Sequence, residues 1–189
     1  MQAKSKTDIL RMTMLAMMVA IGVVISPILR IEGMCPMAHL INITCAVFMG
    51  PWYSLLCATL IGIIRMSFMG IPPLALTGAV FGAFLSGVLY RASKGKLWCA
   101  VLGEVIGTGI IGSLISYPVM AFLVHKSGLT WFFYTPLFIS GTLIGGAIAF
   151  VFLTALRRTG MLAKIQTALG GKVYELSHPA GRPAPADSN

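Results

Sequence analysis

Long apolar stretches, separated by short turns or basic segments, fill most of this chain and restrict what it can fold into. Six stretches are candidate membrane spans: residues 9–29, 37–49, 51–69, 73–91, 97–124 and 132–156. A helix needs about 20 apolar residues to cross the hydrocarbon core of a bilayer. Only 10% of the 189 residues are charged and the mean hydropathy is +0.89, whereas about 25% of an average soluble domain is charged. The sequence therefore predicts an all-α integral membrane protein with about six transmembrane helices.

The second apolar stretch is shorter than the others. It lies between Pro36 and the Gly50-Pro51 turn and has about 13 residues, roughly 20 Å at 1.5 Å per residue. It forms either a short second transmembrane helix or one arm of a re-entrant hairpin with the third stretch. Both alternatives leave the later spans with the same orientation.

The distribution of Lys and Arg predicts that orientation. Of the 14 basic residues, only Arg30, Arg65 and Lys126 fall on one side of the predicted membrane. Because cytoplasmic loops carry the excess of Lys and Arg, both termini are expected in the cytoplasm. Residues 1–8 then form a cytoplasmic N-terminal segment, 9–157 the membrane domain in the cell (plasma) membrane, and 158–189 a cytoplasmic tail. We expect the tail to be disordered from about residue 170.

Few polar side chains lie within the predicted spans, and they are the candidates for binding a small molecule. Glu104 is the only carboxylate well inside a span, and ionisable groups in a membrane indicate function by default. His39 and Asn42 share a face at the outer end of the second span, and both donate and accept hydrogen bonds. On this interpretation His39 and Glu104 lie near opposite ends of the membrane. The predicted substrate-binding residues are His39, Asn42, Arg65, Thr77, Glu104 and Tyr117.

Several of these candidates are expected to lie near the outer face of the membrane. Arg65 is placed near the outer end of the third span, where its side chain either reaches the lipid headgroups or pairs with a ligand or with Glu32. The Gly-Pro break at residues 69–73, with Thr77 just beyond it, fits one wall of an outward-facing pocket, because broken helices at membrane depth line cavities.

The sequence contains no pattern that indicates catalysis. It has no nucleotide-binding Walker A motif, no HExxH motif and no Cys or His pair at metal-ligand spacing. We therefore predict no enzyme activity, no catalytic residue, no metal and no cofactor. The net charge of +9 reflects topology, since a nucleic-acid partner would need a basic face on a folded surface.

Small residues four positions apart recur along the spans, as in Gly103 and Gly107 of the fifth. Such spacing lets membrane helices approach closely. Ala16 and Ala20 of the first span differ from the rest because methionines, whose flexible side chains suit an adaptable contact, surround them. Ala16 and Ala20 are therefore candidates for docking a partner helix.

The stretch CPMAHLINITCAVFMGPWYSLLCATLIGIIR, the Gly-Pro break and LTGAVFGAFLSGVLYR resemble the ThiW family. This family comprises substrate-binding (S) components of energy-coupling factor (ECF) transporters. The resemblance covers roughly residues 8–157, and Ala16-Met-Met-Val-Ala20 resembles the AxxxA motif with which S components dock on their partner.

The resemblance implies a six-helix protein that captures a thiamin precursor, the thiazole moiety hydroxyethyl-methylthiazole, from outside the cell. It also implies three partners, a transmembrane coupling (T) subunit and two cytoplasmic ATPase subunits. From the residues alone, two other functions stay open: a self-sufficient secondary transporter with Glu104 as its proton-coupling group, and an intramembrane enzyme that uses Glu104 or His39.

Overall fold

The computed structural model describes residues 2–30 and 34–174, and every regular element in these ranges is helical. The all-α prediction is therefore confirmed. The helices are α1 (Gln2–Ile25), α2 (Pro36–Met49), α3 (Pro51–Met69), α4 (Leu74–Ala92), α5 (Leu97–Glu104), η1 (Val105–Gly112), α6 (Ser113–Pro118), η2 (Val119–Leu123), α7 (Thr135–Arg158) and α8 (Met161–Ala168).

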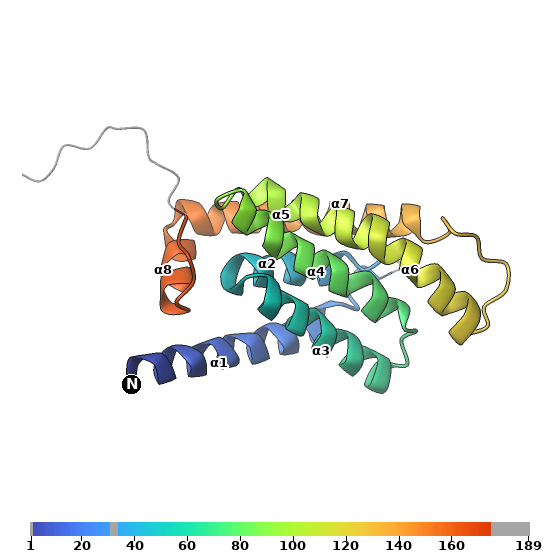
Figure 1. The fold of residues 1–189 in the computed structure, drawn as a ribbon, viewed down its shortest axis with the longest axis horizontal. Helices are drawn as coiled ribbons and strands as arrows, with labels where there is room; N and C mark the ends of the chain where they lie inside the picture. The colour runs from blue at the N-terminus through green and yellow to red at the C-terminus, as the bar shows by residue number, and fades with distance from the viewer. Residues whose placement is uncertain (1, 31–33, 175–189) are drawn as a thin grey trace, which may run out of the picture.

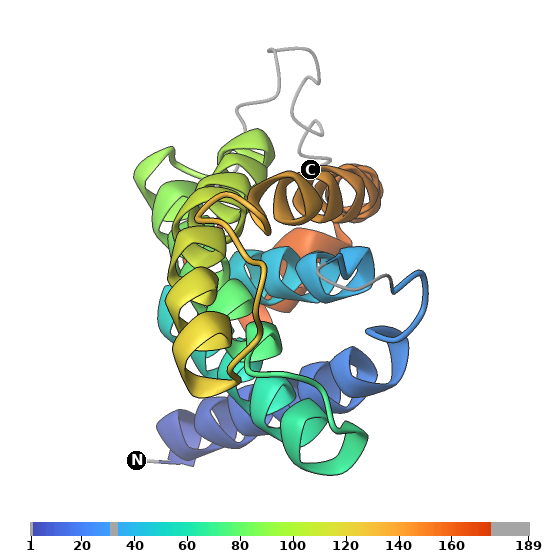
Figure 2. The same ribbon diagram turned by 90° about the vertical axis from the view of Figure 1, so that its right-hand side faces the viewer.

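The helices form a bundle with α2 at its centre. Figure 1 shows α1 along one side of the bundle and α7 along the opposite side, and the end-on view of Figure 2 places α2 between them. Twelve of the 14 residues of α2 are buried. Burial among the other helices therefore explains why the short second stretch, α2, is apolar.

Two glycines end helices where the chain reverses. Gly50 adopts φ = +90° between α2 and α3, and Pro51 begins α3. Gly70 adopts the left-handed conformation at the end of α3. Both conformations favour a residue without a Cβ atom. Pro51 at the first helical position needs no amide hydrogen there, so the local sequence explains both turns.

Helix α4 and the α5–η1 segment approach closely through glycines. A Cβ atom built on Gly107 would lie 2.6 Å from Gly82 Cα and 2.6 Å from the Phe81 carbonyl oxygen. Distances this short leave no space for a side chain. The four-residue spacing of Gly103 and Gly107 therefore serves helix packing, in the way small residues do between membrane helices.

The fifth predicted span is one continuous helical path from Leu97 to Leu123, although its geometry is not uniformly α-helical. Segments η1 and η2 are π-helices. Such segments are rare in proteins and frequently occur at functional sites. Segment η1 begins directly after Glu104, the carboxylate expected to be functional.

The structure differs from the predictions near both ends of the chain. Helix α1 begins at Gln2 and ends at Ile25, whereas the predicted span began at residue 9 and ended at residue 29. The predicted tail contains α8, whose Gln166 Nε2 donates hydrogen bonds to the Val47 carbonyl oxygen (2.8 Å) and to the Tyr90 hydroxyl (3.1 Å). The apolar pattern of α8 was too short to predict a helix. The tail beyond residue 174 lies outside the described residues.

The outer surface of the bundle is apolar. Five of the described helical segments are long and apolar enough to span a membrane, and α2 is a shorter apolar helix. Large apolar side chains such as Phe68, Phe122 and Val151 are exposed. Contact with lipid explains this surface, as expected of a multi-pass membrane protein.

Candidate binding site

The structure contains a cavity of about 340 Å³ beside the turn between α3 and α4. Figure 1 shows this turn at the end of the bundle away from the N-terminus. The wall of the cavity comes from the segment before α2, the first turns of α2 and α4, the last turns of α3 and parts of η1 and α7. Ligand pockets usually have volumes of about 300–1,000 Å³, so this one suits a small ligand. The lining residues are Arg30, Met34, Cys35, Ala38, His39, Arg65, Ile71, Pro72, Leu74, Ala75, Gly78, Ala79, Thr108 and Phe138.

The cavity wall is mainly apolar, with a few polar side chains. Ile71 and Pro72, from the predicted Gly-Pro break, form part of it. Of the predicted substrate-binding residues, His39 and Arg65 line the cavity. This combination of an apolar wall with a few placed polar groups is typical of small-molecule sites.

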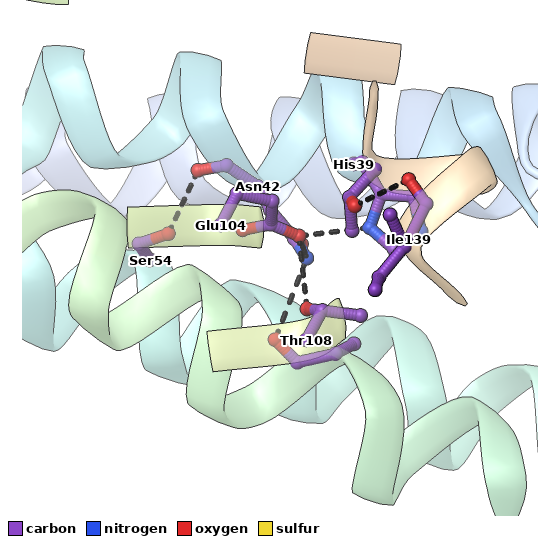
Figure 3. Close-up of polar contacts among 8 residues, drawn as sticks. His39, Asn42, Ser54, Glu104, Thr108 and Ile139 are labelled. Carbon is purple, nitrogen blue, oxygen red and sulfur yellow. Dashed lines mark hydrogen bonds and ion pairs between the residues drawn. The ribbon is translucent and has the colours of Figure 1, made fainter. Parts of the chain in front are cut away.

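Glu104 is fully buried behind this wall and holds a cluster of polar side chains together. Its Oε1 atom lies 2.8 Å from His39 Nδ1 and accepts hydrogen bonds from Asn42 Nδ2 (2.9 Å) and Thr108 Oγ1 (3.2 Å). Figure 3 shows these three side chains pointing toward Glu104 from two sides. Asn42 and Glu104 do not line the cavity, so they support His39 and Thr108 from behind.

The expectation that His39 and Glu104 lie near opposite ends of the membrane is wrong. The last turn of α2 lies beside the end of α4, where Arg91 Nη2 donates to the Met49 carbonyl oxygen (3.3 Å). Counted from this end of the bundle, His39 is about 15 Å along α2 and Glu104 about 10 Å along α5, at 1.5 Å per residue. Because α2 is short, its outer end lies deep in the bundle, and the two side chains meet.

Arg65 is buried, with 4% of its surface exposed, so the interpretation in which it reaches the lipid headgroups is wrong. Its Nη2 atom lies 3.5 Å from Cys35 Sγ, and its Nε atom has no hydrogen-bond partner among the described residues. A buried guanidinium group with an unmet N–H is unfavourable unless an acceptor reaches it. Glu32, its other expected partner, lies outside the described residues.

Besides Asn42 and Glu104, two more predicted substrate-binding residues do not line the cavity. Thr77 Oγ1 lies 2.7 Å from Ser116 Oγ and therefore joins α4 to α6. The Tyr117 ring packs against Trp131, with ring centroids 4.5 Å apart. The sequence gives the position of a residue along its helix, but it does not show which side of that helix faces the cavity.

Sequence reasoning gave no site role to several lining residues, among them Cys35, Thr108 and Phe138. Thr108 is one helical turn after Glu104, and that spacing is a signal that could have identified it. Cys35 is four residues before His39, but it forms no pair at metal-ligand spacing, so nothing in the sequence selected it. Phe138 carries no polar signal, and only the fold brings it to the cavity.

The predicted docking residues Ala16 and Ala20 are both exposed on α1. A different face of α1 packs into the core through Leu15 and Val19. No described residue of α1 lines the cavity. Hence the candidate docking face and the candidate binding site are on separate parts of the molecule.

The comparisons with known proteins identify a family. A family model described as "Thiamine-precursor transporter protein (ThiW)" matches residues 12–159, which include every residue of the cavity wall. Searches of curated proteins and of solved structures each returned no match. The matched family consists of transporters and not of enzymes, which agrees with the resemblance of the sequence. The chain belongs to the ThiW family of thiamine-precursor transporters.

Proposed function

We propose that this protein is the substrate-binding (S) component of an ECF-type importer and that it binds hydroxyethyl-methylthiazole, the thiazole precursor of thiamin. The observation that carries the proposal is the cavity of about 340 Å³ with His39 and Arg65 in its wall. A small heterocycle fits an apolar wall with a few hydrogen-bonding groups. On the orientation predicted from Lys and Arg, this cavity opens toward the outside of the cell.

The proposed partners are a T subunit and two cytoplasmic ATPases. The sequence has no nucleotide-binding motif of its own, so uptake against a gradient needs energy from elsewhere. Ala16 and Ala20 are exposed on α1 and four residues apart, which suits close contact with a helix of the T subunit. Nothing in the site favours proton-coupled transport, because Glu104 is fully buried, holds three hydrogen-bonded neighbours and does not line the cavity.

The test is to reconstitute the purified chain in liposomes, alone and together with the T subunit and both ATPases. We expect radiolabelled hydroxyethyl-methylthiazole to bind the isolated chain but to accumulate only in liposomes that contain all partners and ATP. Mass spectrometry of the molecule that co-purifies with the chain is expected to find the thiazole alcohol. Accumulation by the chain alone under an ion gradient would contradict the proposal, and so would a lack of binding.

A thiol reagent offers an independent test of ligand position. Cys35 is half-buried and lines the cavity, whereas Cys45, Cys57 and Cys99 are buried in the bundle. We expect a small water-soluble maleimide to label Cys35 first. The thiazole alcohol at about ten times its Kd is expected to slow labelling about tenfold, since it occupies most of the sites.

The Cys35→Ser variant is the control for this labelling experiment and is expected to lose the fast reaction. If the thiazole alcohol binds but leaves the labelling rate of Cys35 unchanged, the ligand is not in this cavity.

A further inference from the structure

The hydrogen bonds of Glu104 fix one edge of the His39 ring. The Oε1 atom accepts from the amide of Asn42 and from the hydroxyl of Thr108, and it also lies 2.8 Å from His39 Nδ1. We assign Oε1 as the acceptor for all three neighbours, so that His39 Nδ1 is an N–H donor. Figure 3 shows the ring held between Glu104 and α7.

We take His39 to be neutral, which balances the charges that the described residues place around the cavity. Among the described residues, Glu104 is the sole carboxylate beside the cavity and Arg65 the sole buried guanidinium. Arg30, also in the wall, is exposed to solvent. One negative and one positive charge cancel only if the imidazole carries none, and uncompensated charge is costly inside a membrane protein. A neutral ring with its proton on Nδ1 presents Nε2 as a hydrogen-bond acceptor.

His39 and Arg65 present opposite kinds of hydrogen-bonding group, an acceptor and a donor. No hydrogen bond joins His39 Nε2 to a described residue, and this buried side chain retains 8% exposure. Arg65, which also lines the cavity, carries hydrogen-bond donors alone, and its buried Nε–H is unmet. Arg65 Nη2 contacts Cys35, which precedes His39 by one helical turn. An acceptor and a donor therefore lie in neighbouring parts of the same wall.

We propose that this pair recognises the hydroxyl of the cargo: His39 Nε2 accepts its hydrogen, and the guanidinium group of Arg65 donates to its oxygen. Glu104 is the positioning residue, because its hydrogen bond keeps the proton of His39 on Nδ1. This proposal rests on the proposed function and narrows the ligand to a small neutral heterocycle whose side chain ends in an alcohol. A hydroxyl group satisfies both protein atoms, since it donates and accepts.

Three ligands that differ in one group test this recognition. The methylthiazole ring carries a hydroxyethyl, a methoxyethyl or an ethyl group, which respectively donate and accept, accept only, or do neither. We expect the hydroxyethyl ligand to bind about tenfold more tightly than the methoxyethyl ligand, and the methoxyethyl ligand about tenfold more tightly than the ethyl ligand. Isothermal titration of the purified full chain measures all three affinities.

Two variants test which residue causes each of the two tenfold differences in affinity. His39→Phe is expected to remove the difference between the hydroxyethyl and methoxyethyl ligands, and Arg65→Met the difference between the methoxyethyl and ethyl ligands. Equal binding of all three ligands to the unaltered chain would overturn this inference while the proposed function stands. Binding of none would overturn the proposed function, and this inference with it.

Nitrogen NMR tests the role of Glu104 separately from affinity. The chain has three histidines, so a His125→Gln, His178→Gln variant keeps only His39. We expect a ¹⁵N shift typical of a protonated nitrogen at Nδ1 and one typical of an unprotonated nitrogen at Nε2. Glu104→Gln can still accept from Nδ1 and is expected to keep this pattern. Glu104→Met is expected to give a mixture of tautomers and to bind the hydroxyethyl ligand no better than the methoxyethyl ligand.

A protonated Nε2 in the unaltered pocket would overturn the inference, because the ring would then offer the cargo a donor. If Glu104→Met does not fold, the spectra of the His39-only chain and of its Glu104→Gln form still decide the tautomer.

Discussion

Replacing Gly107 with alanine is expected to destabilise the protein by about 3 kcal/mol, the upper range for overpacking a well-packed core. The new methyl group would lie 2.6 Å from Gly82 Cα and from the Phe81 carbonyl oxygen. Backbone atoms cannot rotate away as a side chain can, so η1 must move off α4. For a chain of this length, the loss corresponds to a decrease in Tm of roughly 5–10 °C, measured by thermal unfolding in detergent.

The same substitution is expected to weaken ligand binding. Thr108 directly follows Gly107 in the sequence, and Glu104 precedes it by three residues. Glu104 is also close to α4, because a Cβ built on Gly82 would lie 2.9 Å from the Glu104 carboxyl carbon. Movement of η1 therefore displaces the acceptor that holds His39. A titration with hydroxyethyl-methylthiazole measures this loss in the fraction that remains folded.

Gly109→Ala is the matched control, because Gly109 is in the same π-helical segment and faces a different neighbour. A Cβ there would lie 3.0 Å from Ile139 Cγ1, and a side-chain atom of this kind can shift. We expect a change of about 1 kcal/mol or less for this variant. Similar Tm values for the two variants would show that the contact between η1 and α4 is not close-packed.

Hydropathy predicted most of the fold because each signal is local. The ends of α2, α3 and α4 were predicted within one residue, since Pro36, Gly50-Pro51 and the Gly-Pro break mark them in the sequence. Helix α8 was missed because a helix of eight residues is too short for its apolar pattern to be distinctive. Its stability comes from contacts with residues distant in sequence, such as Arg11, whose guanidinium donates to the Leu169 and Gly170 carbonyl oxygens.

The site was harder to predict than the spans because it depends on the depth and rotation of each helix. Glu104, His39 and Asn42 were each selected as unusual polar groups in apolar surroundings, and the fold brings them together. Their separation was misjudged because a sequence does not show how deep in the bundle a short helix begins. Thr77 and Tyr117 were selected by position along the chain, but helix rotation turns Thr77 toward Ser116 and places Tyr117 against Trp131.

Placing tryptophan at both Ala16 and Ala20 is expected to abolish assembly with the T subunit. The two small side chains are exposed on one face of α1, where they would let a partner helix approach closely. Each indole ring would hold that helix away, at a cost of roughly 1–3 kcal/mol per site, so the complex should form at least about 30-fold more weakly. Co-purification of the T subunit and both ATPases with the variant, in the presence of detergent, measures the loss.

The separation of α1 from the cavity is what makes this prediction specific. No described residue of α1 lines the cavity, so the double variant is expected to bind hydroxyethyl-methylthiazole as the unaltered chain does. Ile21→Trp is the matched control, because Ile21 is exposed but lies about 100° around the helix from Ala20. It should add the same bulk and leave assembly intact. If the double variant still retains its partners, or if Ile21→Trp loses them equally, the Ala16–Ala20 face is not where the T subunit binds.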